Sequence, residues 1–146
     1  MDKAQVVERY CQLLSELKEE PRDVVLSAGS ALVMLGIRET TQDLDVDVST
    51  GVFKFLSRTN LVIVEEGISD LIKYGVDVDV HERDSSTGVV CVEGVWLYSP
   101  SSLLMQKRYL AKLPTRKEGK RETDLKEISL LEELIRGQKL TARVMA

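Results

Sequence analysis

Residues 26–48 read "LSAGSALVMLGIRETTQDLDVDV" and end in an alternation of aspartate with aliphatic residues. Successive side chains of a strand point to opposite faces, so Asp43, Asp45 and Asp47 are predicted to share one face. Like charges at this spacing raise one another's pKa values, and a divalent cation, another cation or open water has to offset the repulsion. Taken alone, such an alternation is more typical of a solvated outer face than of a metal site.

The composition is that of one globular domain, because 146 residues can bury a real core but leave little for a second one. A formal net charge of -4 argues against general adhesion to nucleic acids. Cys11 and Cys91 have no metal-ligand spacing and are expected to be reduced thiols in the core, not a disulfide or a zinc site. The chain has neither an apolar stretch long enough for a bilayer nor a signal-peptide profile, so we expect no membrane association and a cytoplasmic location.

Helices and strands are predicted to alternate in the first half of the chain. Apolar residues recur at helical spacing from Lys3 to Glu20, and "DVVLSAG" is typical of a short strand that enters a tight turn. Ser30 is expected to cap a short helix that Gly36 closes. The acidic strand comes next, followed by a helix over 52–56, a strand "LVIVEE" and a second acidic alternation, "YGVDVDVHE".

The second half is predicted to contain a hairpin and C-terminal helices. "VVCVEGVWLY" is typical of a hairpin folded about Glu93 and Gly94. "SPSSLLMQKRYLAKL" begins a helix at its Ser-Pro pair, and a stripe of apolar residues over 123–136 predicts a helix that Gly137 ends. This intermixed α/β (α+β) pattern is expected to fold as a single domain over residues 1–146, with a core at about 22–98 and a helical part at about 99–146.

A wider signature surrounds the first acidic strand. Gly29 and Ser30 stand in a turn about a dozen residues before Asp43 and Asp45, which one apolar residue separates. This arrangement resembles the nucleotidyltransferase superfamily related to DNA polymerase beta. A small prokaryotic branch of this superfamily, which includes abortive-infection and toxin–antitoxin nucleotidyltransferases, is similar to this chain in three stretches. These are "GSALVMLGIRETTQDLDVDV" and, later, "SPSSLLMQKRYLA" and "KRETDLKEISLLEE". The resemblance implies a nucleotidyltransferase fold, with a mixed central sheet flanked by helices and with C-terminal helices.

The residue types of the signature suit phosphate and metal chemistry. Gly29 lets the backbone approach a phosphate closely, and Ser30 adds a hydroxyl donor. Asp43 and Asp45 would hold Mg²⁺ or Mn²⁺, since hard cations prefer oxygen ligands and bridge carboxylates to substrate phosphates. Thr41 lies just before the two acids, where its hydroxyl can reach a phosphate or a metal-bound water.

The resemblance also implies further site residues. A third acid completes such a site and helps to position or deprotonate the attacking hydroxyl. The family's pattern assigns this role to Asp79, and Asp77, on the same face of its strand, is the alternative. Related proteins carry a lysine that approaches the nucleotide phosphates at the position of Lys107. They also carry a basic–acidic pair, matched here by Lys120, Arg121 and Asp124.

Three other features have competing interpretations. Asp47 has no counterpart in the signature and is a peripheral ligand, a structural hydrogen-bonding group or merely exposed. His81, the only histidine, is expected to have a surface or hydrogen-bonded structural role, because this chemistry relies on carboxylates and metal. The basic run over residues 107–121 is either a solvated helix face or a surface that attracts a triphosphate or an RNA acceptor.

The function that the resemblance implies is the Mg²⁺-dependent transfer of a nucleoside monophosphate from a nucleoside triphosphate to a hydroxyl. Because the chain has no separate acceptor-binding domain, we expect a macromolecular acceptor, tRNA or protein, in a toxin–antitoxin or phage-defence system. The competing hypothesis is a nucleotide-binding or partner-binding protein of the same fold with little or no transferase activity. A third is a structural domain that calcium stabilises.

Overall fold

The structure is a computed structural model that describes residues 1–64, 67–84 and 87–145, with side chains described as far as residue 140. The chain divides into two compact units, Met1–Tyr98 and Ser99–Ala146. The first unit contains the sheet and the second contains two helices. The single domain expected over the whole chain stays a prediction.

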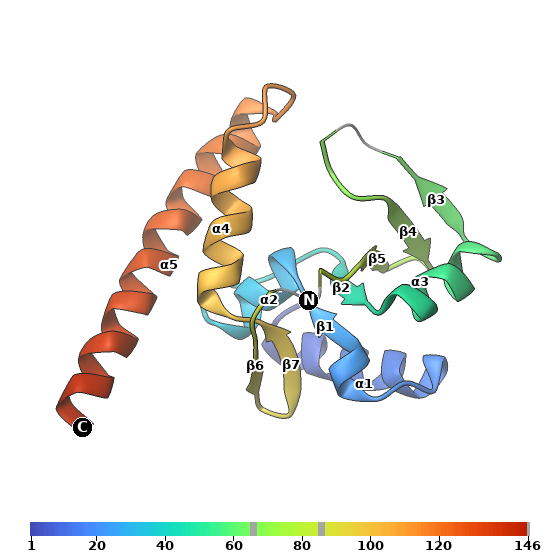
Figure 1. The fold of residues 1–146 in the computed structure, drawn as a ribbon, viewed down its shortest axis with the longest axis horizontal. Helices are drawn as coiled ribbons and strands as arrows, with labels where there is room; N and C mark the ends of the chain where they lie inside the picture. The colour runs from blue at the N-terminus through green and yellow to red at the C-terminus, as the bar shows by residue number, and fades with distance from the viewer. Residues whose placement is uncertain (65–66, 85–86, 146) are drawn as a thin grey trace. The chain divides into compact units, whose positions relative to one another are not determined.

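The first unit is built on a mixed sheet, which has seven strands in the part of the chain that the structure describes (Figure 1). Its strand order is β3-β4-β5-β2-β1-β7-β6. The neighbours β2 and β5 are parallel, as are β1 and β7, and the other neighbours are antiparallel. The predicted mixed central sheet is therefore confirmed. The strands are β1 (Val24–Leu26), β2 (Leu44–Val48), β3 (Leu61–Ile63), β4 (Leu71–Tyr74), β5 (Val78–Glu82), β6 (Val89–Val92) and β7 (Val95–Tyr98).

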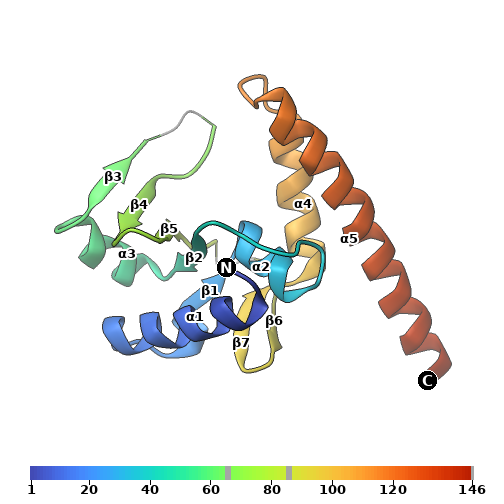
Figure 2. The same ribbon diagram turned by 180° about the vertical axis from the view of Figure 1, so that it is seen from behind.

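Helices flank this sheet in the first unit (Figures 1 and 2). The helix α1 begins at a capping box, in which the Asp2 carboxylate accepts from the Gln5 amide and the Gln5 side chain accepts from the Asp2 amide, both at 2.9 Å. It packs against α2 and β2, whereas α3 packs against β4 and β5. The helical elements are α1 (Lys3–Leu17), the 3₁₀ turn η1 (Pro21–Asp23), α2 (Ala28–Met34) and α3 (Thr50–Ser57).

The start of α2 differs from the prediction. The N-cap residue is Ser27, not Ser30, and Ser30 lies inside the first turn of the helix. The chain turns sharply after β1, because Ala28 already has a positive φ of 43°. Ser30 is consequently fully buried, and its hydroxyl faces the chain that leads into β2.

The sequence analysis missed one strand of the first unit, and one further prediction for this unit is wrong. The strand β4 was not predicted, because the short "LIKY" stretch has no clear alternation; Gly75, with φ 60°, turns it back into β5. Cys11 and Cys91 are free thiols but are exposed, since Cys11 lies off the buried stripe of α1. The predicted strand "LVIVEE" ends at Ile63 as β3, and residues 65–66 lie outside the described residues.

The predicted hairpin is confirmed as β6 and β7. Glu93 and Gly94 form its turn with φ values of 52° and 79°, as expected for a two-residue hairpin turn with two left-handed residues. The last residue of β7, Tyr98, is fully buried and contacts the acidic face of β2 through its hydroxyl group.

The second unit is a hairpin of two helices, α4 (Pro100–Ala111) and α5 (Glu118–Met145), which pack side by side (Figures 1 and 2). The Ser99 hydroxyl caps α4 by accepting from the Ser102 amide at 3.2 Å. The prediction that Gly137 ends the last helix is wrong, because α5 continues through it. A glycine inside a helix costs only about 1 kcal/mol relative to alanine, which a long run of good helix formers can tolerate. Within the described ranges, none of the helices is long and apolar enough to cross a membrane.

Candidate active site

The acidic face predicted for β2 is present and is continued by β5. Along β2 the aliphatic residues are buried, whereas Asp45 and Asp47 are only partly buried, so the two kinds of side chain lie on opposite faces as expected. The parallel pairing of β2 with β5 brings Asp45 into register with Asp79. Residues directly opposite one another in neighbouring strands point to the same face of the sheet. Two acids that are 34 positions apart in the sequence therefore become direct neighbours.

The turn at the start of α2 is tied to the acidic strand through Ser30. The Ser30 hydroxyl accepts from the Asp45 amide at 2.7 Å and donates to the Asp43 carbonyl at 3.2 Å. The Thr41 hydroxyl donates to the same carbonyl at 3.1 Å. Both hydroxyls that the sequence assigned to the nucleotide thus have backbone partners in this structure. They set the position of the chain that carries Asp43 and Asp45.

Gly29 lies next to the carboxylate of Asp45. A Cβ atom at this position would lie 2.6 Å from Arg38 Nη1, 2.7 Å from Thr41 Oγ1 and 3.4 Å from Asp45 Oδ2. Since real Cβ atoms essentially never approach other atoms within 3 Å, a side chain here would displace its neighbours. The sequence reasoning missed Arg38, although an arginine between the turn and the acids was a usable signal.

The carboxylate of Asp45 lies in an environment that disfavours its charge. Burial, followed by repulsion from Asp79 and then from Asp43, raises the pKa of Asp45 to about 7. A hydrogen bond from the Ser30 amide and attraction to Arg38 act in the opposite direction but do not cancel these effects. The site therefore holds negative charge that its own cations do not fully offset.

The two candidates for the third acid have different surroundings. Asp79 is in register with Asp45 and accepts a hydrogen bond from Lys73 Nζ at 2.6 Å. Asp77 lies in the turn before β5 and forms an ion pair with Arg9, whose Nε is 2.9 Å from Asp77 Oδ2. The carboxylate of Asp79 is thus the one beside Asp45, and that of Asp77 is held by α1.

Whether these residues suit a metal ion depends on their donors. Among the described residues, no three His, Cys, Asp or Glu side chains converge in a way that would hold an ion as they stand. The donor set of Asp43, Asp45 and Asp79 is nevertheless all oxygen, which suits Mg²⁺ or Mn²⁺. The raised pKa of Asp45 marks charge that such an ion would offset. The residues therefore fit a hard divalent cation once their side chains turn toward it.

Asp47 and His81 lie farther along the same strands and are held by structural partners. Asp47 accepts from the Tyr98 hydroxyl at 2.6 Å, and burial raises its pKa. His81 Nδ1 lies 3.0 Å from Ser69 Oγ and 3.1 Å from the Asp70 carbonyl. These contacts agree with the structural role expected for the histidine and select the hydrogen-bonding role among those left open for Asp47.

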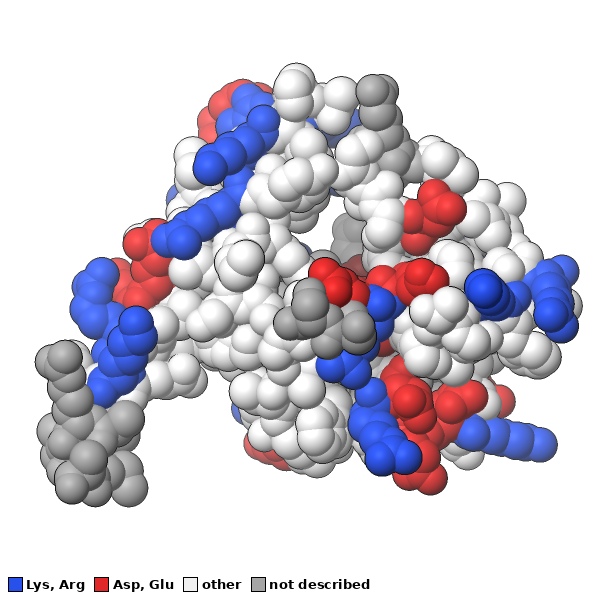
Figure 3. Space-filling view, viewed as in Figure 1, with Lys and Arg blue, Asp and Glu red and all other residues white. Residues whose placement is uncertain are grey.

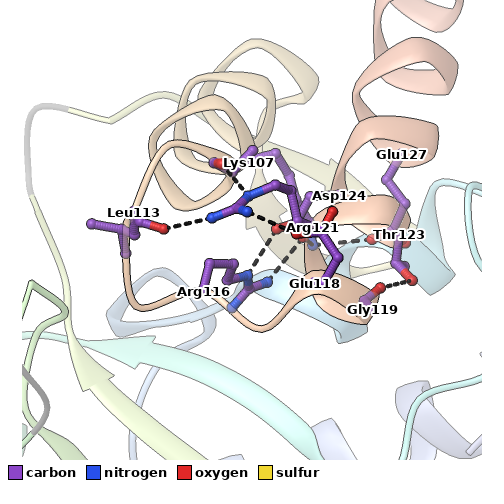
Figure 4. A network of polar contacts seen from close by, with 10 residues as sticks. Lys107, Leu113, Arg116, Glu118, Gly119, Arg121, Thr123, Asp124 and Glu127 are labelled. Carbon is purple, nitrogen blue, oxygen red and sulfur yellow. Dashed lines mark hydrogen bonds and ion pairs between the residues drawn. The ribbon is translucent and has the colours of Figure 1, made fainter.

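Two predicted residues of the second unit, Lys107 and Asp124, belong to a polar network within the helical hairpin (Figure 4). Lys107 Nζ lies 3.0 Å from both Asp124 Oδ1 and Glu127 Oε1. The Arg116 guanidinium donates two hydrogen bonds to the Asp124 carboxylate, of 2.8 and 2.9 Å. The sequence analysis included Arg116 only as part of the basic run and did not name Glu127, because neither has a local pattern that distinguishes it from a solvated charge.

The other two predicted cations of the hairpin differ from Lys107. Arg121 donates to the carbonyls of Ala111 and Leu113, at 3.0 and 2.9 Å, and so holds the end of α4. Lys120 is exposed. In the face drawn in Figure 3, basic and acidic side chains alternate along the helices of this unit. Residues 107–117 contain no acid, and the acids of this unit lie on α5.

Comparisons with known proteins give one structural likeness. No protein-family model and no curated protein matches the chain. The structure is similar to the crystal structure of ANT(2")-Ia in complex with adenylyl-2"-tobramycin, with a TM-score of 0.52 and 13% sequence identity. The match covers 93% of this chain and 99% of that chain. The chain therefore has a nucleotidyltransferase-like fold, a mixed sheet with flanking and C-terminal helices.

Proposed function

We propose that the protein is a nucleotidyltransferase that moves a nucleoside monophosphate from a nucleoside triphosphate to a hydroxyl group of an acceptor. The observation that carries the proposal is the pairing of Asp45 with Asp79 in neighbouring parallel strands, beside a glycine turn tied to the same acids. The fold shared with ANT(2")-Ia supports it independently of the signature. A bound Mg²⁺ or Mn²⁺ ion would supply charge neutralisation between the acids and the triphosphate.

The residues of the first unit divide the work of binding and proton transfer. Asp43 and Asp45, together with Asp79, would hold the divalent ion, and Gly29 leaves room for a phosphate beside the backbone. The Arg38 guanidinium, next to Gly29, adds positive charge where the triphosphate would lie. Asp79 orients the acceptor hydroxyl and accepts its proton, because a carboxylate beside the attacking oxygen is suited to general-base catalysis.

The nucleotide-binding role of residues in the second unit rests on the family resemblance in this proposal. Lys107, Lys120 and Arg121 supply cations, and Asp124 holds the first of them in place. Lys107 is already paired with two carboxylates, so binding a phosphate would require it to share its charge with these partners or to exchange one of them.

For the acceptor, the proposal keeps the expectation of a macromolecule, tRNA or protein, which brings its own binding surface. This would fit a toxin–antitoxin or phage-defence role. The comparison favours a second candidate, a small amino-sugar acceptor. ANT(2")-Ia, 99% of whose chain is covered by the match, holds adenylyl-2"-tobramycin.

The proposal predicts transfer of label from an α-³²P-labelled nucleoside triphosphate, with Mg²⁺ or Mn²⁺, to one of three acceptors: total tRNA, cell protein or tobramycin. Asp43→Asn and Asp45→Asn are each expected to reduce transfer by at least about 100-fold, because each removes charge stabilisation at the phosphate. Glu82→Gln is the matched control. Glu82 lies on the same strand, β5, but its side chain is on the opposite face of the sheet from that of Asp79.

Three outcomes decide between the hypotheses. Label on one acceptor, lost in both aspartate variants and kept in the control, identifies the enzyme and its acceptor class. Triphosphate binding without transfer to any acceptor would favour the catalytically inactive binding protein. Stabilisation by Ca²⁺ with no effect of triphosphate and Mg²⁺ would favour the structural domain.

A further inference from the structure

Lys73 is a cation of the acidic site that the sequence did not reveal. It lies on β4, in register with Asp79 of the neighbouring strand β5, which is in turn in register with Asp45 of β2. Residues in register across neighbouring strands share a face, so one lysine and two aspartates form a row across three strands. Lys73 Nζ lies 2.6 Å from Asp79 Oδ1, the distance of a strong charge-assisted hydrogen bond.

The ammonium group acts on more than one acid. The hydrogen bond to Asp79, followed by attraction to Asp79, Asp43 and Asp45, raises the pKa of Lys73, with burial acting in the opposite direction. The lysine side chain keeps 41% of its surface exposed, compared with 17% for Asp79. Lys73 is thus a partly exposed charged group beside the acids, which can move without unpacking the core.

We propose that Lys73 is the built-in counter-ion of the acidic site, holding Asp79 in place and weakening the binding of a divalent ion that arrives without nucleotide. This inference rests on the function proposed above. An ammonium group donates hydrogen bonds but cannot ligate a metal, so it competes with the ion for Asp79 Oδ1 and repels it. The negative charge of a triphosphate offsets that repulsion, so the ion is bound chiefly together with its nucleotide.

The test is the dissociation constant for Mn²⁺ alone, measured from the electron paramagnetic resonance signal of the free ion in the full-length protein. Lys73→Met keeps the aliphatic stem and removes the charge, and is expected to tighten Mn²⁺ binding by on the order of tenfold. Lys73→Arg keeps the charge and is expected to change the dissociation constant by less than about twofold.

Two controls separate the local effect of Lys73 from that of net charge and from loss of the site. Lys54→Met removes an exposed lysine of α3 and is expected to leave Mn²⁺ binding unchanged. Asp45→Asn, alone or combined with Lys73→Met, is expected to abolish Mn²⁺ binding, because the ion then lacks one of its proposed ligands.

The outcomes distinguish the inference from the proposed function. If Mn²⁺ binding depends on Asp45 but is the same or weaker in Lys73→Met, the counter-ion role is wrong and the proposed function stands. If neither the unchanged protein nor Lys73→Met binds Mn²⁺ without nucleotide, the counter-ion role is wrong, and the labelled-transfer assay decides on the proposed function separately. If Mn²⁺ binds regardless of Asp45, both are wrong. Tighter binding in both Lys73→Met and Lys54→Met would show only a general charge effect and would also overturn the role of Lys73.

Discussion

In the absence of divalent ions at about pH 8, Asp45→Asn is expected to unfold at a higher denaturant concentration than the unchanged protein. Folding raises the pKa of Asp45 from 3.8 to about 7, so the folded state binds more protons between these values. The free energy of unfolding therefore falls as the pH rises from about 4 to 7. Above pH 7 the folded state carries the whole destabilisation that comes from charging Asp45. Three pKa units correspond to about 4 kcal/mol, which is the upper limit of the gain.

The pH dependence makes this expectation specific. At about pH 4 the carboxyl is largely neutral when folded and near its midpoint when unfolded, so the gain in free energy of unfolding should nearly vanish. Glu82→Gln, on the opposite face of the sheet, should show no such pH-dependent gain. Mg²⁺ should stabilise the unchanged protein and not the variant. An Asp45→Asn protein that is less stable than the unchanged one at both pH values would contradict the account.

Asp124→Asn is expected to lower the free energy of unfolding by about 3 kcal/mol, toward the lower end of the range for breaking a buried ion pair. Asp124 is only 1% exposed and is the shared partner of Lys107 and Arg116. Burial alone would raise its pKa, but hydrogen bonds from Arg116 and Lys107 lower it instead. An asparagine leaves two cations facing a neutral amide, although Glu127 still pairs with Lys107.

Denaturant unfolding followed by circular dichroism measures this loss, because α4 and α5 report directly in the helical signal. Glu122→Gln is the matched control, since Glu122 is an exposed acid on the same helix. Its expected effect is within about 0.5 kcal/mol of zero. If Asp124→Asn and Glu122→Gln have equal stability, the buried network does not hold the hairpin together.

The acidic strands could be predicted because their signal is local. Alternation of aspartate with Leu44, Val46 and Val48 sets the two faces of β2 whatever its neighbours are. The pairing of Asp45 with Asp79 could not be predicted from the residues, because it depends on which strands lie side by side and in which register. The family resemblance supplied that expectation.

The missed features share a physical cause, which is dependence on long-range contacts. Lys73 was not predicted as a site residue because β4 is short and takes its strand conformation from pairing with β3 and β5. Ser30 was expected at a cap because serine prefers one, but tertiary hydrogen bonds to the chain of Asp43 and Asp45 bury it. Gly137 was expected to end a helix that continues to Met145.

The most direct test of the shared metal site is a crystal soaked with Mn²⁺ and a non-hydrolysable nucleoside triphosphate, with the metal located by anomalous scattering. The account predicts a peak bridging the triphosphate to Asp43 and Asp45, with carboxylate oxygens of these residues and of Asp79 within about 2.0–2.3 Å of Mn²⁺ ions. Manganese found away from these acids, or a triphosphate bound away from Gly29, would contradict it.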